Sequence, residues 1–151
     1  MATVYDHVKL FKQKYSGGIS WRLKKHSKVI EQHLNPSESV IYAFPGQKND
    51  NPFDWVSTCV VAITSKRILI AQKRVVWGYF LISITPDLYN DLSIYAGLFW
   101  GKLNLDTVKE IVTISNLPKK SLDEIETHIS EYMMEKKKEF KTREMNNEKN
   151  N

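Results

Sequence analysis

The fifteen residues of Val60–Arg74 read VVAITSKRILIAQKR. Two apolar runs rich in β-branched residues flank a polar break at Thr64–Arg67, a pattern that predicts two strands joined by a tight turn. Basic pairs stand at both ends of the second strand, Lys66–Arg67 and Lys73–Arg74. Side chains alternate along a strand, and six or seven residues span roughly 20 Å, so one phosphate cannot contact both pairs. The stretch therefore predicts a β-hairpin more strongly than a phosphate site.

The same pattern continues on both sides of this hairpin. Short runs rich in Val, Ile, Thr, Tyr, Phe and Trp predict strands near 39–47, 55–64, 67–73, 76–84, 91–96, 98–105 and 108–114. The breaks at Gly46–Asp54 and 84–91 contain Asn, Asp and Pro, which favour loops. Seven short antiparallel strands with tight connections predict a barrel or a sandwich.

A helix of about four turns is predicted before the strands, in the stretch SGGISWRLKKHSKVIEQHLNP at 16–36. It ends at Asn35–Pro36, because proline disfavours helical geometry in the residue before it. At 100° per residue the apolar face contains Ile19, Leu23, His26, Ile30, His33 and Leu34. The opposite face contains Trp21, Lys24, Lys25, Lys28 and Gln32.

A second helix is predicted after the strands. Ser121 and Glu124 have the spacing of a capping box, in which each side chain bonds the other residue's backbone N–H. The stripe that follows needs a surface to cover and consists of Leu122, Ile125, Ile129, Tyr132 and Met133. After Glu135 the chain is mostly charged, and we expect the helix to fray into a disordered tail. The predicted division is a basic helical segment at 1–36, a main domain at 37–135 and a charged tail at 136–151.

The composition is typical of one folded domain: 151 residues, of which 42% are hydrophobic and 26% charged. The single cysteine, Cys59, excludes an intrachain disulfide and suits a reducing compartment. No apolar run approaches the roughly 20 residues of a membrane span. The net charge is +5, and Met1–Glu38 holds seven Lys or Arg against three acids. We therefore expect a cytoplasmic protein whose basic bias lies before the main domain.

Four stretches in order resemble the bacterial pleckstrin-homology-like domains, specifically the YokE-like group: LNPSESVIYAF (34–44), VVAITSKRILIAQKR (60–74), ISITPDLYNDLSIYAGLFWGKLNL (82–105) and VKEIVTISNLPKKSLDEIETHISEYM (108–133). That family has an lTxxRll hairpin, an Ile-Pro strand end, a glycine-containing hairpin and a C-terminal helix. The resemblance covers about 34–134. It implies a mainly β (α+β) fold: a seven-stranded, bent antiparallel barrel capped by the last helix, here with an extra N-terminal helix.

Function follows less directly, because this fold hosts unrelated activities. We expect a non-catalytic binding or adaptor domain with a protein partner or self-association. The alternative is weak peripheral binding to anionic membrane lipid, at the inner face of the membrane. Nucleic acid is not expected, since aromatic and basic residues do not alternate along one strand. The candidate surface for either function consists of Trp21, Lys24, Lys25, Lys28, Lys73 and Arg74.

Phosphoinositide-binding relatives generally carry a Lys-x(n)-Lys/Arg-x-Arg pattern across the first two strands, and this sequence offers only Lys48 there. Catalytic, cofactor and metal residues are not predicted. His26 and His33 lie two helical turns apart, too far to ligate one metal alone. Gly17–Gly18 lacks the Lys-Ser/Thr of a phosphate loop. A minor enzymatic alternative would use loop carboxylates, namely Asp50, Asp54, Asp87 and Asp91.

Overall fold

The computed structural model describes residues 1–51, 54 and 56–151. Its helices are α1 (Val4–Lys14), α2 (Leu23–His33) and α3 (Leu122–Lys149), the last preceded by a 3₁₀ turn η1 (Lys119–Ser121). Its strands are β1 (Val40–Gln47), β2 (Thr58–Thr64), β3 (Ile68–Lys73), β4 (Tyr79–Ile84), β5 (Tyr89–Ala96), β6 (Gly101–Thr107) and β7 (Ile111–Leu117). The seven predicted strands are confirmed, with shifted ends. Trp55, assigned from sequence to the start of a strand, lies outside the described residues.

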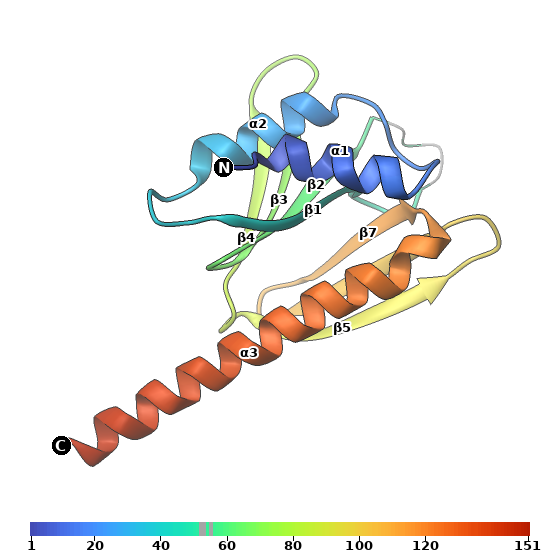
Figure 1. The fold of residues 1–151 in the computed structure, drawn as a ribbon. Coiled ribbons are helices and arrows are strands. Elements are labelled where there is room, and N and C mark those ends of the chain that lie inside the picture. Colours follow the sequence, from blue (N-terminus) through green and yellow to red (C-terminus); the bar gives the residue numbers. More distant parts are fainter. Residues whose placement is uncertain (52–53, 55) are drawn as a thin grey trace.

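The strands form one antiparallel sheet in the order β4-β3-β2-β1-β7-β6-β5. Within the described strands β1 and β7 are paired only at Gln47 and Ser115, so the sheet turns there into two layers. The layers are β1–β4 and β5–β7 (Figure 1). The predicted bent, seven-stranded antiparallel fold is confirmed, and because β4 and β5 are edge strands, the sheet does not close on itself.

The main core lies between the two layers and α3. Phe44, Ile63 and Ile70 from the first layer meet Leu103, Leu105 and Ile114 from the second. The predicted stripe of α3 is buried in the same cluster, at Leu122, Ile125, Ile129, Tyr132 and Met133. The helix therefore caps the sheet as predicted.

The predicted capping box of α3 is wrong. Ser121 is the N-cap, but its hydroxyl donates to the Pro118 carbonyl and caps no α3 backbone N–H group. Glu124 instead accepts from Lys14 and Tyr42. A capping box does exist at α1, where Thr3 and Asp6 bond each other's backbone N–H groups.

A second apolar layer covers the outer face of β1–β3. Val4 and Val8 of α1 and Ile30 of α2 pack there against Val60 and Leu69. Figure 1 shows the two helices side by side over this face. As a result β2 is buried on both faces, which explains why its sequence is a continuous apolar run and not an alternating one.

Two helix predictions need correction. The N-terminal segment contains two helices, and α2 spans the 11 residues Leu23–His33, which is shorter than the predicted helix of about four turns ending at Asn35–Pro36. Its lysine face is exposed and its apolar face is buried, as predicted. The last helix also extends past the predicted end near Glu135, because α3 continues to Lys149 and projects beyond the sheets (Figure 1). Disorder of the tail stays a prediction. The division at residues 36 and 135 stays a prediction.

Candidate functional site

Arg67, the second member of the first basic pair, is part of a buried ion pair. Its Nε and Nη2 donate to the two carboxylate oxygens of Glu38 at 3.0 and 3.1 Å. Nη2 also donates to the His33 carbonyl, and Nη1 to Ser83. Burial opposes ionisation of Glu38, but the hydrogen bonds from Arg67, Thr64 and Asn35 outweigh it and lower the pKa of that carboxyl. Arg67 therefore stabilises the fold and is not free to bind a ligand.

The second basic pair is held only through its backbone. The Lys73 N–H donates to Nδ1 of His26 at 2.8 Å, and the Arg74 carbonyl accepts from Nη2 of Arg22 at 3.0 Å. Because Nδ1 of His26 is an acceptor, its Nε2 carries the proton and donates to Thr58 Oγ1 at 2.7 Å. Burial and the nearby Arg22 charge lower the pKa of His26 to about 4, which keeps this tautomer neutral at pH 7. The Lys73 and Arg74 side chains take no part in these bonds.

A basic groove of about 370 Å³ lies between α2 and the end of β3. Five of its lining residues carry positive charges, and we call these the groove cations: Arg22, Lys25, Lys28, Lys73 and Arg74. No acidic residue is among the described residues that line it. None of the ion pairs within the described part of the chain involves a groove cation. The groove thus concentrates positive charge without internal neutralisation.

An apolar turn adjoins this groove. Val75, Val76 and Trp77 connect β3 to β4 and are 54%, 79% and 78% exposed. The Arg74 N–H donates to the Gly78 carbonyl, and Gly78 has a φ of 78°, a left-handed conformation that favours glycine. The turn is therefore fixed by backbone geometry while its three apolar side chains gain little burial within the chain.

Four of the six residues predicted from sequence line the groove, namely Lys25, Lys28, Lys73 and Arg74. Lys24 lines an adjoining hollow of about 500 Å³, which also contacts Lys25 and Lys28. Trp21 lies before α2 and lines neither space; the Arg22 guanidinium sits 5.2 Å from its ring centroid. The fold thus brings the helix lysines together with Lys73 and Arg74, and it leaves Trp21 outside the groove.

Arg22 and the apolar turn were missed by sequence reasoning. Arg22 has a left-handed φ of 59° just before α2, and no local pattern in the sequence marks that conformation. Val75–Trp77 consists of strong β-formers, and the predicted strand at 76–84 includes Val76 and Trp77. Gly78 was the available signal for a turn.

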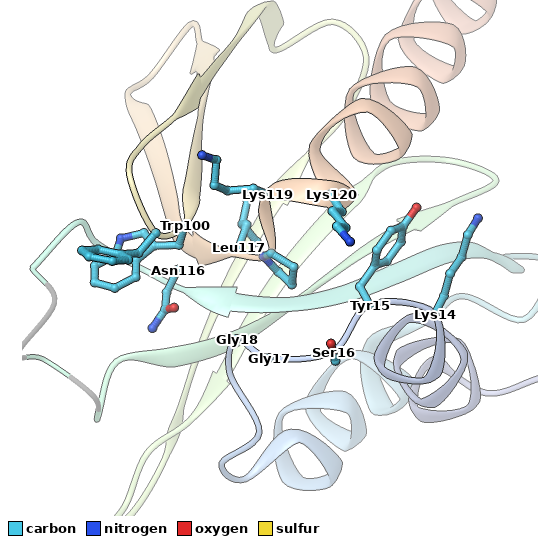
Figure 2. A pocket seen from close by; sticks show the side chains of 12 residues that line it. Lys14, Tyr15, Ser16, Gly17, Gly18, Trp100, Asn116, Leu117, Lys119 and Lys120 are labelled. Carbon is cyan, nitrogen blue, oxygen red and sulfur yellow. The ribbon is translucent and has the colours of Figure 1, made fainter.

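A second hollow, of about 390 Å³, lies beside the turn between β5 and β6. Figure 2 shows Trp100 and Asn116 at one end and Lys14 and Tyr15 at the other. Lys119 and Lys120 of η1 lie along one side. Leu98, Phe99 and Trp100 of this turn are 82%, 77% and 42% exposed. The sequence had placed these three in a strand as well.

The loop carboxylates of the enzymatic alternative do not converge. Asp50 lies 3.5 Å from Lys102 at the Tyr95 end of the β5–β6 hairpin. Asp91 pairs with Asp106 at the opposite end of the same hairpin. Asp54 accepts hydrogen bonds from Ser57 and Asn49 within its own loop, and Asp87 faces α3. The four side chains therefore do not form one site.

The side chains that could bind a metal ion or act as a nucleophile are not arranged for either role in the described part of the chain. Across residues 1–51, 54 and 56–151, no three His, Cys, Asp or Glu side chains are grouped so as to hold a metal ion. Cys59 is fully buried, and burial raises the pKa of its thiol to about 12, so it stays protonated. None of the described helices has the length and apolar character needed to span a bilayer.

The comparisons with known proteins agree with this architecture. A family model described as Bacterial PH domain matches residues 34–131. The crystal structure of a pleckstrin homology domain from Shewanella amazonensis SB2B is similar at a TM-score of 0.54, with 18% identity over 74% of this chain and 98% of that chain. At this identity the likeness shows the fold alone.

A second solved structure is also similar. It is a DUF1696 family protein with a pleckstrin-homology domain from Shewanella loihica PV-4, at a TM-score of 0.48 and 15% identity, over 80% of this chain and 97% of that chain. No curated protein matches the chain.

Proposed function

Because the chain belongs to the bacterial PH domain family, we propose that it is a non-catalytic binding module that docks on anionic membrane surfaces. Domains of this type generally bind proteins or lipids. The observation that carries the proposal is the basic groove lying next to the exposed turn Val75–Trp77. The placement in the YokE-like group and the cytoplasmic location stay predictions.

The charge of the groove supports stronger membrane binding than the sequence predicts from the three lysines of the helix alone. Each Lys or Arg near an anionic surface contributes about 1 kcal/mol, so five groove cations supply about 5 kcal/mol. Their side chains are not neutralised by acids that line the groove. The attraction should weaken as salt screens it.

The turn supplies the apolar half of the contact. Trp and Val at the tip of a hairpin can enter the headgroup region, where an indole ring finds both apolar and polar surroundings. Val75 and Val76 of the turn line the same groove as the five cations. Both halves can therefore contact one surface together.

Sedimentation with vesicles tests the proposal. We expect binding to vesicles of phosphatidylglycerol and phosphatidylcholine, little binding to phosphatidylcholine alone, and a decline with rising salt. The variant Lys73→Gln/Arg74→Gln removes two charges and should lose about 2 kcal/mol, or roughly thirtyfold in affinity. Trp77→Ala should weaken binding as well. These side chains make no hydrogen bond that holds the hairpin, so the variants should stay folded.

The second hollow provides matched controls. Lys119→Gln/Lys120→Gln removes the same charge, and Trp100→Ala removes the same ring, from a different surface. Both variants should bind vesicles like the parent protein. Absence of binding at low salt, equal binding to neutral vesicles, or equal loss in the control variants would each refute docking through the groove.

A further inference from the structure

We propose that the hollow beside the β5–β6 turn binds an acidic peptide segment of a partner protein, one with an apolar side chain next to its carboxylates. The hollow is formed by the α1–α2 connection, the turn and the β7–η1 segment (Figure 2). It shares no lining residue with the basic groove. The inference therefore goes beyond membrane docking and would make the domain a bridge between a surface and a protein.

The hollow is built on a fixed backbone. A Cβ added to Gly18 would lie 3.3 Å from the Asn116 carbonyl oxygen, so the α1–α2 connection is packed against the end of β7. Lys12 donates through Nζ to the Gly17 carbonyl, and the Gly97 N–H closes the turn onto the Trp100 carbonyl at 2.9 Å. A preformed site binds without the cost of ordering its own walls.

One side of the hollow is positively charged. Lys119 and Lys120 are exposed, and among the described residues neither belongs to an ion pair. Lys14 is already bound to Glu124 at 2.7 Å, which leaves the two η1 lysines as the cations available to a ligand. No acid is found among the described lining residues. Charge complementarity therefore favours an acidic occupant.

The Trp100 end of the hollow is aromatic. The rings of Phe99 and Trp100 have centroids 6.0 Å apart; Phe99 is largely uncovered within the chain and Trp100 is partly exposed. Exposed aromatic residues next to a basic rim are typical anchors at protein interfaces, where Trp carries an unusually large share of the affinity. They give an apolar side chain of the peptide a place to pack while its carboxylates meet Lys119 and Lys120.

A second copy of this chain fits the hollow poorly. The projecting half of α3, residues 136–151, carries six Lys or Arg against three Glu. It would place positive charge against the η1 lysines. The net charge of +5 also opposes contact of one copy's basic surface with another. The acidic peptide is therefore the occupant that the charges select.

Selection from a displayed library of random peptides on the full-length protein tests the inference. We expect the enriched peptides to contain Asp or Glu next to Leu, Phe or another large apolar residue. Synthetic versions of these peptides should lose at least about tenfold in affinity for Trp100→Ala and for Lys119→Glu/Lys120→Glu. Lys73→Glu/Arg74→Glu makes the same change of charge at the groove and should leave peptide affinity within about twofold.

Several results would contradict peptide binding in this hollow. No enriched peptide, enrichment without an acidic bias, or equal loss in the groove variant would overturn the inference. So would a mass above monomer that falls to monomer in Trp100→Ala, because the occupant would then be a second copy. Loss of vesicle binding in Trp100→Ala would assign the turn to the membrane instead. The variants that should weaken one kind of binding serve as controls for the other, so either proposal can fail while the other stands.

Discussion

Replacing Arg67 with Ala should destabilise the protein more than any nearby change of charge. Both carboxylate oxygens of Glu38 are satisfied in the folded chain: Arg67 donates to each, Thr64 Oγ1 donates to Oε1 and the Asn35 N–H donates to Oε2. The Glu38 side chain is fully buried and that of Arg67 is 19% exposed. The substitution leaves a buried carboxylate without its counter-ion.

The expected cost is about 3–5 kcal/mol, the range found when one partner of a buried pair is removed. A small domain has roughly 5–15 kcal/mol of stability, so the loss is a large fraction of the total. Lys66→Ala is the matched control, because Lys66 is exposed and bonds only the Ser37 hydroxyl through its side chain. It should change stability by less than about 0.5 kcal/mol.

Urea unfolding followed by circular dichroism measures both variants. The double variant Arg67→Met/Glu38→Gln should be less destabilised than the sum of its single changes, because it buries no charge.

The pH dependence of the unfolding free energy gives a second check. The pKa of Glu38 is lowered on folding, so its contribution to stability exists at neutral pH and is lost as pH falls below the ordinary carboxyl range. The gap between the parent and Arg67→Ala should therefore narrow in acid; a constant gap, or a cost no larger than that of Lys66→Ala, would refute the reasoning.

Three further predictions concern packing, pH and the last helix. Gly46→Ala should cost about 1–3 kcal/mol in urea unfolding, because its Cβ would lie 2.5 Å from Ile114 Cγ2; an unchanged midpoint would contradict this packing. Since the pKa of His26 falls to about 4 on folding, stability should decline by about 1.4 kcal/mol per pH unit between about 6.5 and about 4, and a His26→Gln variant should lack that slope. Truncation after Glu135 should lower the helical signal but change the unfolding free energy by less than about 1 kcal/mol, since the removed residues are mostly exposed.

The predictions that succeeded rest on periodicity, which a short stretch of sequence records directly. The α3 stripe and the seven strands are of this kind, because each needs only local spacing of apolar residues. Helix α1 carried a usable signal that was overlooked: Thr3 and Asp6 at capping-box spacing, followed by Val4, Val8 and Phe11 on one face. The continuation of α3 follows from its Glu, Lys, Arg and Met residues, which are good helix formers even where nothing is packed against them.

The failures at the two turns share one cause. Val75–Trp77 and Leu98–Trp100 consist of residues that favour strands, so propensity extends each strand into the turn. Apolar residues that are exposed in a turn contribute little to folding, and a large apolar patch on a surface often marks a contact with another molecule. The mismatch between propensity and structure is therefore the best pointer to both candidate surfaces.

The grouping of the basic residues could be foreseen only in part. Lys25 and Lys28 come from a helix, and Lys73 and Arg74 from a strand end far along the chain, so their meeting depends on α2 packing against β3. The apolar face of a helix is visible in a single sequence, but the strand against which it packs is not. Charge and spacing therefore identify Lys25, Lys28, Lys73 and Arg74 as candidates but do not predict that they line one groove.

Of the two basic pairs around β3, we expect the first to act in stability through Arg67 and the second to act in binding. Arg67 lies at the start of the strand in a buried pair, whereas Lys73 and Arg74 lie at its end with free side chains, roughly 20 Å away. Arg67→Ala should lower the unfolding free energy but leave the vesicle affinity of the folded fraction within about twofold. Lys73→Gln/Arg74→Gln should do the reverse, with stability within about 0.5 kcal/mol of the parent protein. If Arg67→Ala weakened binding of the folded protein as strongly as the groove variant, the two pairs would act on one ligand, and the separation of fold and surface along this strand would be wrong.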